Sequence, residues 1–308
     1  MDRIEELKKK RNAIILAHNY QPPEVQDVAD YYQPPEVQDV ADLCGDSLEL
    51  AIRASKTKAD VIVFCGVHFM AETASIVCPD KTVLFPAPDA GCPMADMVTV
   101  SALQRKMSQL NAIPVVTYVN SPASVKAIST ICCTSANAVK VVNSLDASEV
   151  LMTPDRNLAT YTAGLTGKKI HLWEGCCPVH DALSAADVRR ARERHPDAAV
   201  MAHPECRSEV LALADVVLST SGMLGYARES AVEKFLVATE NGLLYSLKKA
   251  CPDKTFFPVS DKMVCPDMKR ITLEMIADCL ENMAPEVRVP TDIQQRALGA
   301  VRKMLALK

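Results

Sequence analysis

One pattern, repeated three times, constrains the fold of this chain of 308 residues more than any other feature. In each copy a polar helix precedes an apolar strand that ends in polar residues, and a later apolar run leads to a Cys-Pro step. These steps stand at Cys92, Cys177 and Cys265. In the first and third copies a lysine lies 11 positions before the cysteine, at Lys81 (92 − 81) and Lys254 (265 − 254), and the middle copy is shorter by two. The three cysteines therefore occupy equivalent loops.

The strands of this pattern predict the class of fold. We expect polar helices at 2–10, 96–110 and 183–195, and strands at 13–20, 113–120, 198–206, 59–66, 147–152 and 214–220. Strands that are apolar throughout are typical of parallel sheets covered by helices on both faces. We therefore predict an α/β fold of three α/β/α sandwich domains, at 1–95, 96–182 and 183–268, with closing helices in 269–308. Because ligands bind beyond the carboxyl ends of such strands, we expect one shared site between the domains.

A second, shorter repeat interrupts the first domain. The segment YQPPEVQDVAD occurs at 20–30 and again, identically, at 32–42, with a period of 12 residues. Because the unit occurs only twice, it does not predict a solenoid. It has the character of a local duplication that extends a helix or loop near the predicted site.

Composition excludes several classes of function. The net charge is −4 with both signs well mixed, which argues against a nucleic-acid or anionic-membrane surface. The first residues form a charged amphipathic helix without the apolar region of a secretory signal. The longest apolar run, 61–70, is far shorter than a membrane span. Twelve cysteines without an export signal favour metal or cluster ligands over disulfides, so we expect a cytoplasmic protein.

The three equivalent thiols predict a metal centre. Any one of Cys92, Cys177 and Cys265 could be an ordinary core residue, since free cysteine is often buried. At equivalent loop positions before proline, the trio instead suits a [4Fe–4S] cluster, which normally takes four protein sulfurs. A missing fourth ligand leaves one iron open as a Lewis acid for substrate oxygens. Zinc held by three thiolates is the alternative.

Polar side chains at three strand ends are candidate site residues. They are His18, Asn19 and Tyr20, then Tyr118 and Asn120, then His203 and Glu205. A single histidine at a strand end is more often capped or solvated, but three converging clusters favour a site. Glu205 beside His203 provides a base and a partner for proton transfer. His180, three residues after Cys177, is a neighbour of the metal or a substrate contact.

Hydroxyl-rich segments begin three predicted helices, at 45–48, 133–138 and 219–223. Serine and threonine are ordinary helix N-caps. A helix N-terminus with free backbone donors is also an anion site, so three of them facing one centre could hold phosphate and carboxylates. The sequence contains no Walker loop and no GxGxxG fingerprint, which leaves nucleotide binding without support.

Taken together, the motifs resemble one known family over nearly the whole chain and in the same order. They include HNYQPPEVQDVAD, GDSLELA, AETASIV, AGCPMADM, YVN, CTSANAVK, WEGCCPVH, HPEC, STSGM, ATENGLLYSLKK and VCPDMKRITLE. The family that they resemble is quinolinate synthase. The resemblance implies three similar α/β/α domains around a pseudo-threefold axis with a [4Fe–4S] cluster at the centre. It also implies condensation of iminoaspartate with dihydroxyacetone phosphate to quinolinate, with loss of phosphate and water, in NAD biosynthesis.

The same resemblance implies a role for each matching residue. The cluster ligands are expected to be Cys92, Cys177 and Cys265. Catalytic roles are expected for Glu205, Tyr20 and His203. Substrate contacts are expected from His18, Ser47, Tyr118, Asn120, Ser135, His180, Ser219 and Thr220. An L-aspartate oxidase is the functional partner that the unstable imine implies.

The tandem segment is a departure from the family, which has one copy of it. Tyr20 stands two residues after His18, and Tyr32 occupies the same place in the second copy, so either tyrosine could serve the site. Three other functions stay open on the sequence. They are a different [4Fe–4S] hydro-lyase, a zinc-stabilised or metal-free binding protein, and a catalytically impaired family member.

Overall fold

The structure is a computed structural model that describes residues 2–29 and 44–307. The second copy of the tandem segment, with Tyr32, therefore lies outside the described residues. Among those residues, no helix combines the length and apolar character needed to cross a membrane.

Helices and strands follow one another in the same order in three successive parts of the chain. The first part consists of α1 (Asp2–Arg11), β1 (Ala13–His18), α2 (Pro23–Val28), β2 (Cys44–Gly45), α3 (Ser47–Lys56), β3 (Val61–Cys65), α4 (His68–Val77), β4 (Thr82–Leu84) and α5 (Pro93–Asp96). The second consists of α6 (Val100–Gln109), β5 (Val115–Tyr118), α7 (Ala123–Lys126), β6 (Ile131–Cys133), α8 (Ala138–Asn143), β7 (Glu149–Thr153), α9 (Arg156–Gly164), β8 (Lys169–Leu172) and α10 (Pro178–Asp181). The third consists of α11 (Ala185–Arg194), β9 (Ala199–Ala202), α12 (Ser208–Leu211), β10 (Val216–Val217), α13 (Thr220–Glu229), β11 (Lys234–Ala238), α14 (Leu243–Ala250), β12 (Thr255–Pro258) and the 3₁₀ helix η2 (Asp267–Lys269).

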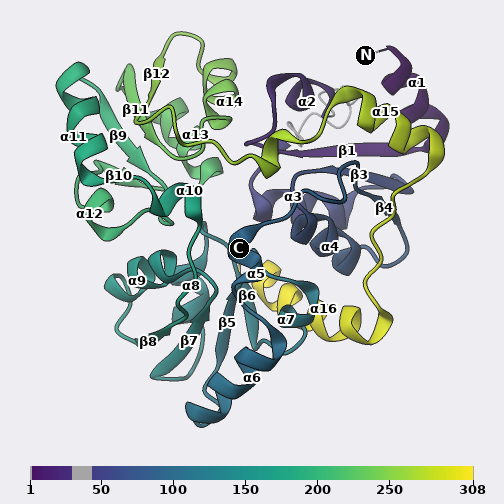
Figure 1. Cartoon of the computed structure of the whole chain (residues 1–308), viewed down its shortest axis with the longest axis horizontal. Helices are drawn as coiled ribbons and strands as arrows, with labels where there is room; N and C mark the ends of the chain where they lie inside the picture. The colour runs from purple at the N-terminus through teal and green to yellow at the C-terminus, as the bar shows by residue number, and fades with distance from the viewer. Residues whose placement is uncertain (1, 30–43, 308) are drawn as a thin grey trace.

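Each part contains one four-stranded parallel sheet, and the strand order is the same in all three. The orders are β2-β1-β3-β4, β6-β5-β7-β8 and β10-β9-β11-β12. Figure 1 shows the three sheets as lobes around the middle of the molecule, the first at upper right, the second below and the third at upper left. The predicted α/β fold with three parallel sheets is confirmed.

Local sequence explains why these elements form. All but the first residue of β1 are buried, as expected for a strand covered on both faces. Ser184 and Asp187 form a capping box at the start of α11. Asp46 caps α3 through the backbone N–H groups of Leu48 and Glu49. The largest hydrophobic core cluster draws residues from all three sheets, which ties the lobes together.

Two predicted elements need correction. The helix expected at 96–110 begins at Val100, because the Thr99 side chain caps it by accepting from the N–H of Ala102. The strand expected at 214–220 is only Val216–Val217, and it is the second strand of its part. The true counterpart of β3 and β7 is β11, which the sequence analysis missed although its residues KFLVA are apolar after the first.

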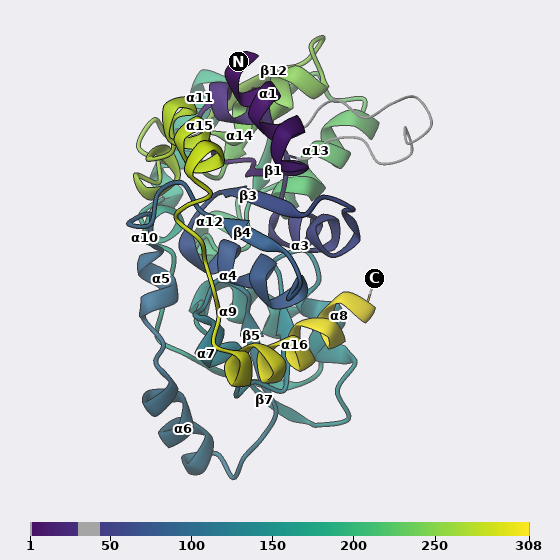
Figure 2. The same ribbon diagram turned by 90° about the vertical axis from the view of Figure 1, so that its right-hand side faces the viewer.

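Two helices close the chain, at the places expected. They are α15 (Leu273–Asn282), which packs against α1, and α16 (Thr291–Ala306), which packs against β6, α7 and α4. The side view in Figure 2 shows α15 beside α1 and α16 alongside the second sheet. Since α16 contacts both the first and the second part, it fastens these two parts to each other.

Candidate active site

The carboxyl ends of the strands surround one cavity of about 210 Å³. All the predicted site residues except Asn19 and Ser219 line it, namely His18, Tyr20, Ser47, Cys92, Tyr118, Asn120, Ser135, Cys177, His180, His203, Glu205, Thr220 and Cys265. Ser219 instead caps α13, where its hydroxyl accepts from the N–H of Gly222 at 3.2 Å. Its side chain lines an open groove of about 750 Å³ that shares Asp46 and Ser135 with the cavity.

The three predicted ligand cysteines have the same local structure. Each precedes a proline at the start of a short helix. Pro93 and Pro178 are the first residues of α5 and α10, and Pro266 is the N-cap of η2. The backbone N–H groups two or three residues further on hydrogen-bond to each sulfur, and these bonds lower the thiol pKa. Burial outweighs them and raises the pKa of Cys92 to about 12 and that of Cys177 well above its usual value. Three partly buried cysteines whose sulfurs have N–H donors suit a bound cation that replaces the thiol protons.

Two buried carboxylates hold two of these cysteine loops. The N–H of Cys177 donates to Asp155 Oδ2 at 3.0 Å, and the N–H of Cys265 donates to Glu240 Oε1 at 3.1 Å. Both carboxylates lie two residues after the third strand of their part, after β7 and β11. The first part has Val67 at the corresponding position. Neither carboxylate was predicted from the sequence, and in the third part the strand before Glu240 was not recognised.

Two buried histidines have matching environments at the ends of β1 and β9. The N–H of Tyr20 donates to His18 Nδ1 at 3.2 Å, and the N–H of Glu205 donates to His203 Nδ1 at 3.4 Å. Burial lowers the pKa of both imidazoles to about 3, so both are neutral at pH 7. With Nδ1 accepting, the remaining proton lies on Nε2, which contacts Ser135 Oγ at 3.2 Å in the case of His203. Each histidine can therefore donate one hydrogen bond to an oxygen.

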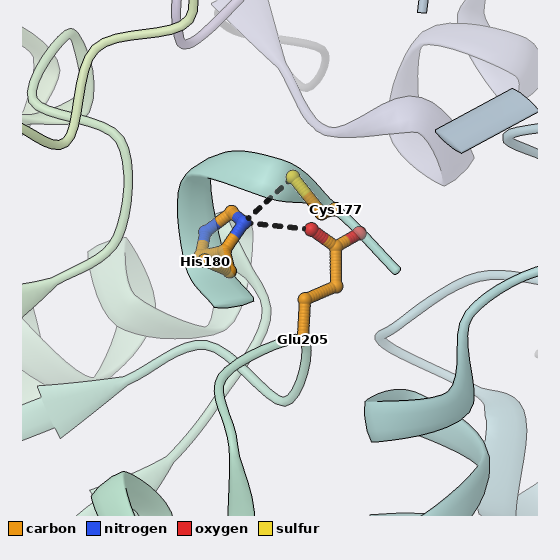
Figure 3. A group of neighbouring side chains, drawn as sticks. All are labelled: Cys177, His180 and Glu205. Atoms are coloured by element: carbon orange, nitrogen blue, oxygen red, sulfur yellow. Dashed lines mark hydrogen bonds and ion pairs between the residues drawn. The ribbon is translucent and has the colours of Figure 1, made fainter. Parts of the chain in front are cut away.

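Glu205 is one of the buried carboxylates at the cavity. Its Oε1 accepts from the Tyr118 hydroxyl at 2.7 Å, and its Oε2 lies 2.8 Å from His180 Nδ1. Figure 3 shows the His180 ring facing both this carboxylate and the sulfur of Cys177, which lies 3.3 Å from the same nitrogen. Burial alone raises the pKa of Glu205. The two histidines beside it and the hydrogen bonds at its carboxylate outweigh burial and lower this pKa to about 2.

The residues Cys177, His180 and Glu205 also form a group that could hold a metal ion. One ligand atom from each lies within 4.8 Å of the others. All twelve cysteines of the described residues are free thiols. The chain is thus rich in cysteine and offers metal ligands at the cavity.

One polar atom at the cavity lacks a partner among the described residues. Asn120 Oδ1 is buried and accepts no hydrogen bond there, although the side chain lines the cavity. Burying an unpaired amide oxygen costs about 1–3 kcal/mol, which a ligand that donates a hydrogen bond would remove. By contrast, the Thr220 hydroxyl, which also lines the cavity, accepts a hydrogen bond from Asn19 Nδ2 at 3.3 Å.

Thr239 is a further residue that the sequence analysis missed. It follows the last residue of β11, and its side chain is fully buried. Its hydroxyl lies 2.6 Å from the Tyr20 hydroxyl and 2.8 Å from His180 Nε2. Recognising KFLVA as the third strand would have placed this threonine at a strand end, where the other candidates lie.

Comparisons with known proteins show which family this chain resembles. A sequence profile described as "Quinolinate synthetase A protein" matches residues 2–32 and 29–306. A protein named quinolinate synthase from Geobacter sp. (strain M21) is 51% identical over 99% of this chain and 96% of its own length. Proteins of the same name from Geotalea uraniireducens (strain Rf4) and Methanosarcina barkeri (strain Fusaro / DSM 804) are 53% and 52% identical, over 99% and 100% of this chain and 96% and 97% of their own lengths. This chain therefore belongs to the quinolinate synthase family.

Proposed function

We propose that this protein is a quinolinate synthase that condenses iminoaspartate with dihydroxyacetone phosphate and releases quinolinate, phosphate and water. The observation that carries the proposal is the convergence of three equivalent thiols, two neutral histidines and one ionised glutamate on one cavity. The family membership supports the choice of substrates. An enzyme that oxidises L-aspartate is needed to supply the imine.

The cofactor that we propose is a [4Fe–4S] cluster held by Cys92, Cys177 and Cys265. The shared Cys-Pro geometry and the N–H donors to each sulfur support this ligand set. When bound, a cluster with only three protein sulfurs supplies one iron with an open position, a Lewis acid for carboxylate or hydroxyl oxygens.

Substrate anions are held by the neutral donors of the cavity. The Nε2–H groups of His18 and His203 and the hydroxyls of Ser47, Ser135 and Thr220 can each donate to a phosphate or carboxylate oxygen. Asn120 Oδ1 remains as an acceptor for an amine or hydroxyl of the substrate. No arginine lines the cavity among the described residues, so binding relies on these donors and on the bound cation.

Proton transfer is assigned to Glu205 and Tyr20. Imine–enamine condensation, carbonyl isomerisation and dehydration each move a proton and polarise an oxygen. The ionised Glu205 carboxylate is a group at the cavity that can take a proton, and the Tyr20 hydroxyl is a group that can give one. Tyr118 hydrogen-bonds to Glu205 and orients its carboxylate.

The tandem segment leaves the site assembled. Tyr20, at the start of the first copy, has its phenol at the cavity, and Ser47, after the second copy, lines the same cavity. Both flanks of the inserted residues therefore reach the site. We assign the tyrosine role to Tyr20 and not to Tyr32, the copy that lies outside the described residues.

Replacing each tyrosine tests this assignment. Tyr20→Phe is expected to lower kcat by about 10- to 100-fold, because it removes a buried hydrogen bond and the phenolic proton. Tyr32→Phe is the matched control and should keep the activity of the parent. A large loss in the Tyr32 variant together with a neutral Tyr20 variant would reverse the assignment.

The function itself is tested by anaerobic reconstitution with iron and sulfide, followed by an assay of quinolinate formation from iminoaspartate and dihydroxyacetone phosphate. We expect turnover that requires both substrates. A deletion variant lacking residues 31–42 restores the single copy typical of the family and serves as the comparison. A loaded parent without turnover, beside an active deletion variant, would identify a catalytically impaired family member.

A further inference from the structure

One fully buried lysine lies next to the cavity without lining it. This residue is Lys126, the last residue of α7. Its ammonium donates to the carbonyl of Ser121 at 2.6 Å and lies over the ring of Phe69, 5.6 Å from the ring centroid. Phe69 lines the cavity, and Ser121 directly follows Asn120, which lines it too. The ammonium is therefore in contact with the residues that form this side of the cavity.

The charge of this ammonium is not neutralised by an ion pair within residues 2–29 and 44–307. Burial lowers the pKa of Lys126, and negative charge at Glu72, Cys132 or Cys92 raises it. The Glu72 carboxylate accepts from the N–H of Ala123 at 2.9 Å instead. Burial raises the pKa of Cys132 to about 12, so this thiol is neutral at pH 7. Because a buried ammonium is costly unless an opposite charge compensates it, Cys92 is the group that gives this charge a purpose.

Comparison with the first part shows that the contact with the backbone carbonyl needs no charge. Gln26 in α2 corresponds to Lys126 in α7, since each stands four positions after the N-cap of its helix (26 − 22 and 126 − 122). Gln26 Nε2 donates to the carbonyl of Gln21 at 2.8 Å, as the Lys126 ammonium does to that of Ser121. The third part has Leu211 at this position. A neutral amide makes the same hydrogen bond, so the positive charge is what distinguishes the second part.

We propose that Lys126 is the buried counter-charge of the metal centre, and that its ammonium stabilises the negative charge of the ligating sulfurs on the Cys92 side of the cavity. Metal binding replaces the protons of three thiols, and three thiolates carry more negative charge than a divalent cation or a [4Fe–4S]²⁺ core balances. The site becomes more negative when it is loaded, and a neighbouring ammonium favours that change. The inference rests on the ligand set of the proposed function, but not on the identity of the substrates.

The first test titrates the full-length, metal-free protein with Co²⁺ under anaerobic conditions and follows the thiolate-to-cobalt absorption. Loss of this absorption in Cys92→Ala identifies the site. Lys126→Gln removes the charge and keeps a donor for the carbonyl of Ser121, as Gln26 does in the first part. We expect it to weaken Co²⁺ binding by about 10-fold, the size expected for one unit charge at the effective dielectric constant of a protein site. An unchanged affinity would overturn the proposal.

A second buried lysine provides the matched control. Lys8 in α1 pairs with Glu5 at 3.1 Å and does not line the cavity. Lys8→Gln also exchanges a buried ammonium for an amide, and it should bind Co²⁺ as tightly as the parent. An equal loss of affinity in this variant would show a general effect of removing a buried lysine, and the role of Lys126 would fall.

The second test measures the midpoint reduction potential of the cluster-loaded protein, which depends on the net charge around the cluster. Lys126→Gln should move the potential to a more negative value, because the ammonium no longer stabilises the added electron. Glu72 lines an outer pocket together with Cys92, so Glu72→Gln removes a negative charge from the same side. It should move the potential in the opposite direction. Shifts of the same sign in both variants, or no shift in Lys126→Gln, would contradict an electrostatic role.

The two tests separate the inference from the proposed function. A loaded parent that forms no quinolinate would end the functional proposal, while both measurements on Lys126 would keep their meaning. A parent that takes up Co²⁺ but no cluster would end the proposed cofactor, and the Co²⁺ affinities would still decide the role of Lys126. A parent that binds neither Co²⁺ nor iron at Cys92 would overturn the inference itself.

Discussion

Replacement of any one of Cys92, Cys177 and Cys265 by alanine is expected to remove most of the iron from the protein and to abolish turnover. The parent should carry about four irons and four sulfides per chain, as a [4Fe–4S] cluster requires. The three sulfurs border the same cavity, so a cluster held by all of them loses a third of its protein ligands with each substitution. Iron and acid-labile sulfide per chain, with the visible spectrum, are the measurements.

Two further cysteines provide matched controls for this experiment. Cys78 and Cys251 occupy equivalent positions in the first and third parts, each before a Pro-Asp-Lys sequence. Both are buried, and neither lines the cavity. The Cys78 thiol donates to the carbonyl of Ala54 at 3.0 Å, which is a structural contact. Alanine at either position should keep the iron. A parent that takes up no iron after anaerobic reconstitution would end the proposal of a cluster, and retention of iron in Cys177→Ala would remove that ligand from the set.

Replacement of Glu205 by glutamine is expected to lower kcat by about 10²- to 10⁴-fold, the usual contribution of a general base. The substitution keeps the size of the side chain but removes its charge. It also puts an N–H₂ group where the carboxylate accepts from Tyr118 and His180. Cluster content should stay near that of the parent, which separates a loss of proton transfer from a loss of iron.

The chain offers a second histidine–glutamate pair as the control. Glu149 Oε2 lies 2.7 Å from His171 Nε2, and 40% of the Glu149 side chain is exposed. Glu149→Gln should leave turnover unchanged, since exposed ion pairs contribute little. A Glu205→Gln enzyme that keeps more than about a tenth of the activity would exclude Glu205 as the base.

Local patterns were enough to predict much of the fold. The apolar strands and the polar helices are visible in short windows of sequence, because a strand covered on both faces must be apolar along its length. Capping residues decided the ends, and the prediction failed where the Thr99 cap moved the start of α6 to Val100. It also failed in the third part, where the two-residue strand β10 drew the assignment away from β11.

The sequence by itself determined the threefold pattern, the equivalent positions of Cys92, Cys177 and Cys265, and most of the polar residues at the strand ends. These signals are local, since each consists of a short motif at a fixed distance from a strand. The tertiary structure alone decided which polar groups pair with one another. The Tyr20–Thr239, His180–Thr239 and Tyr118–Glu205 bonds join residues 219, 59 and 87 positions apart. Such pairs form only when loops from different sheets meet at one cavity, and no local pattern records the distance between their side chains.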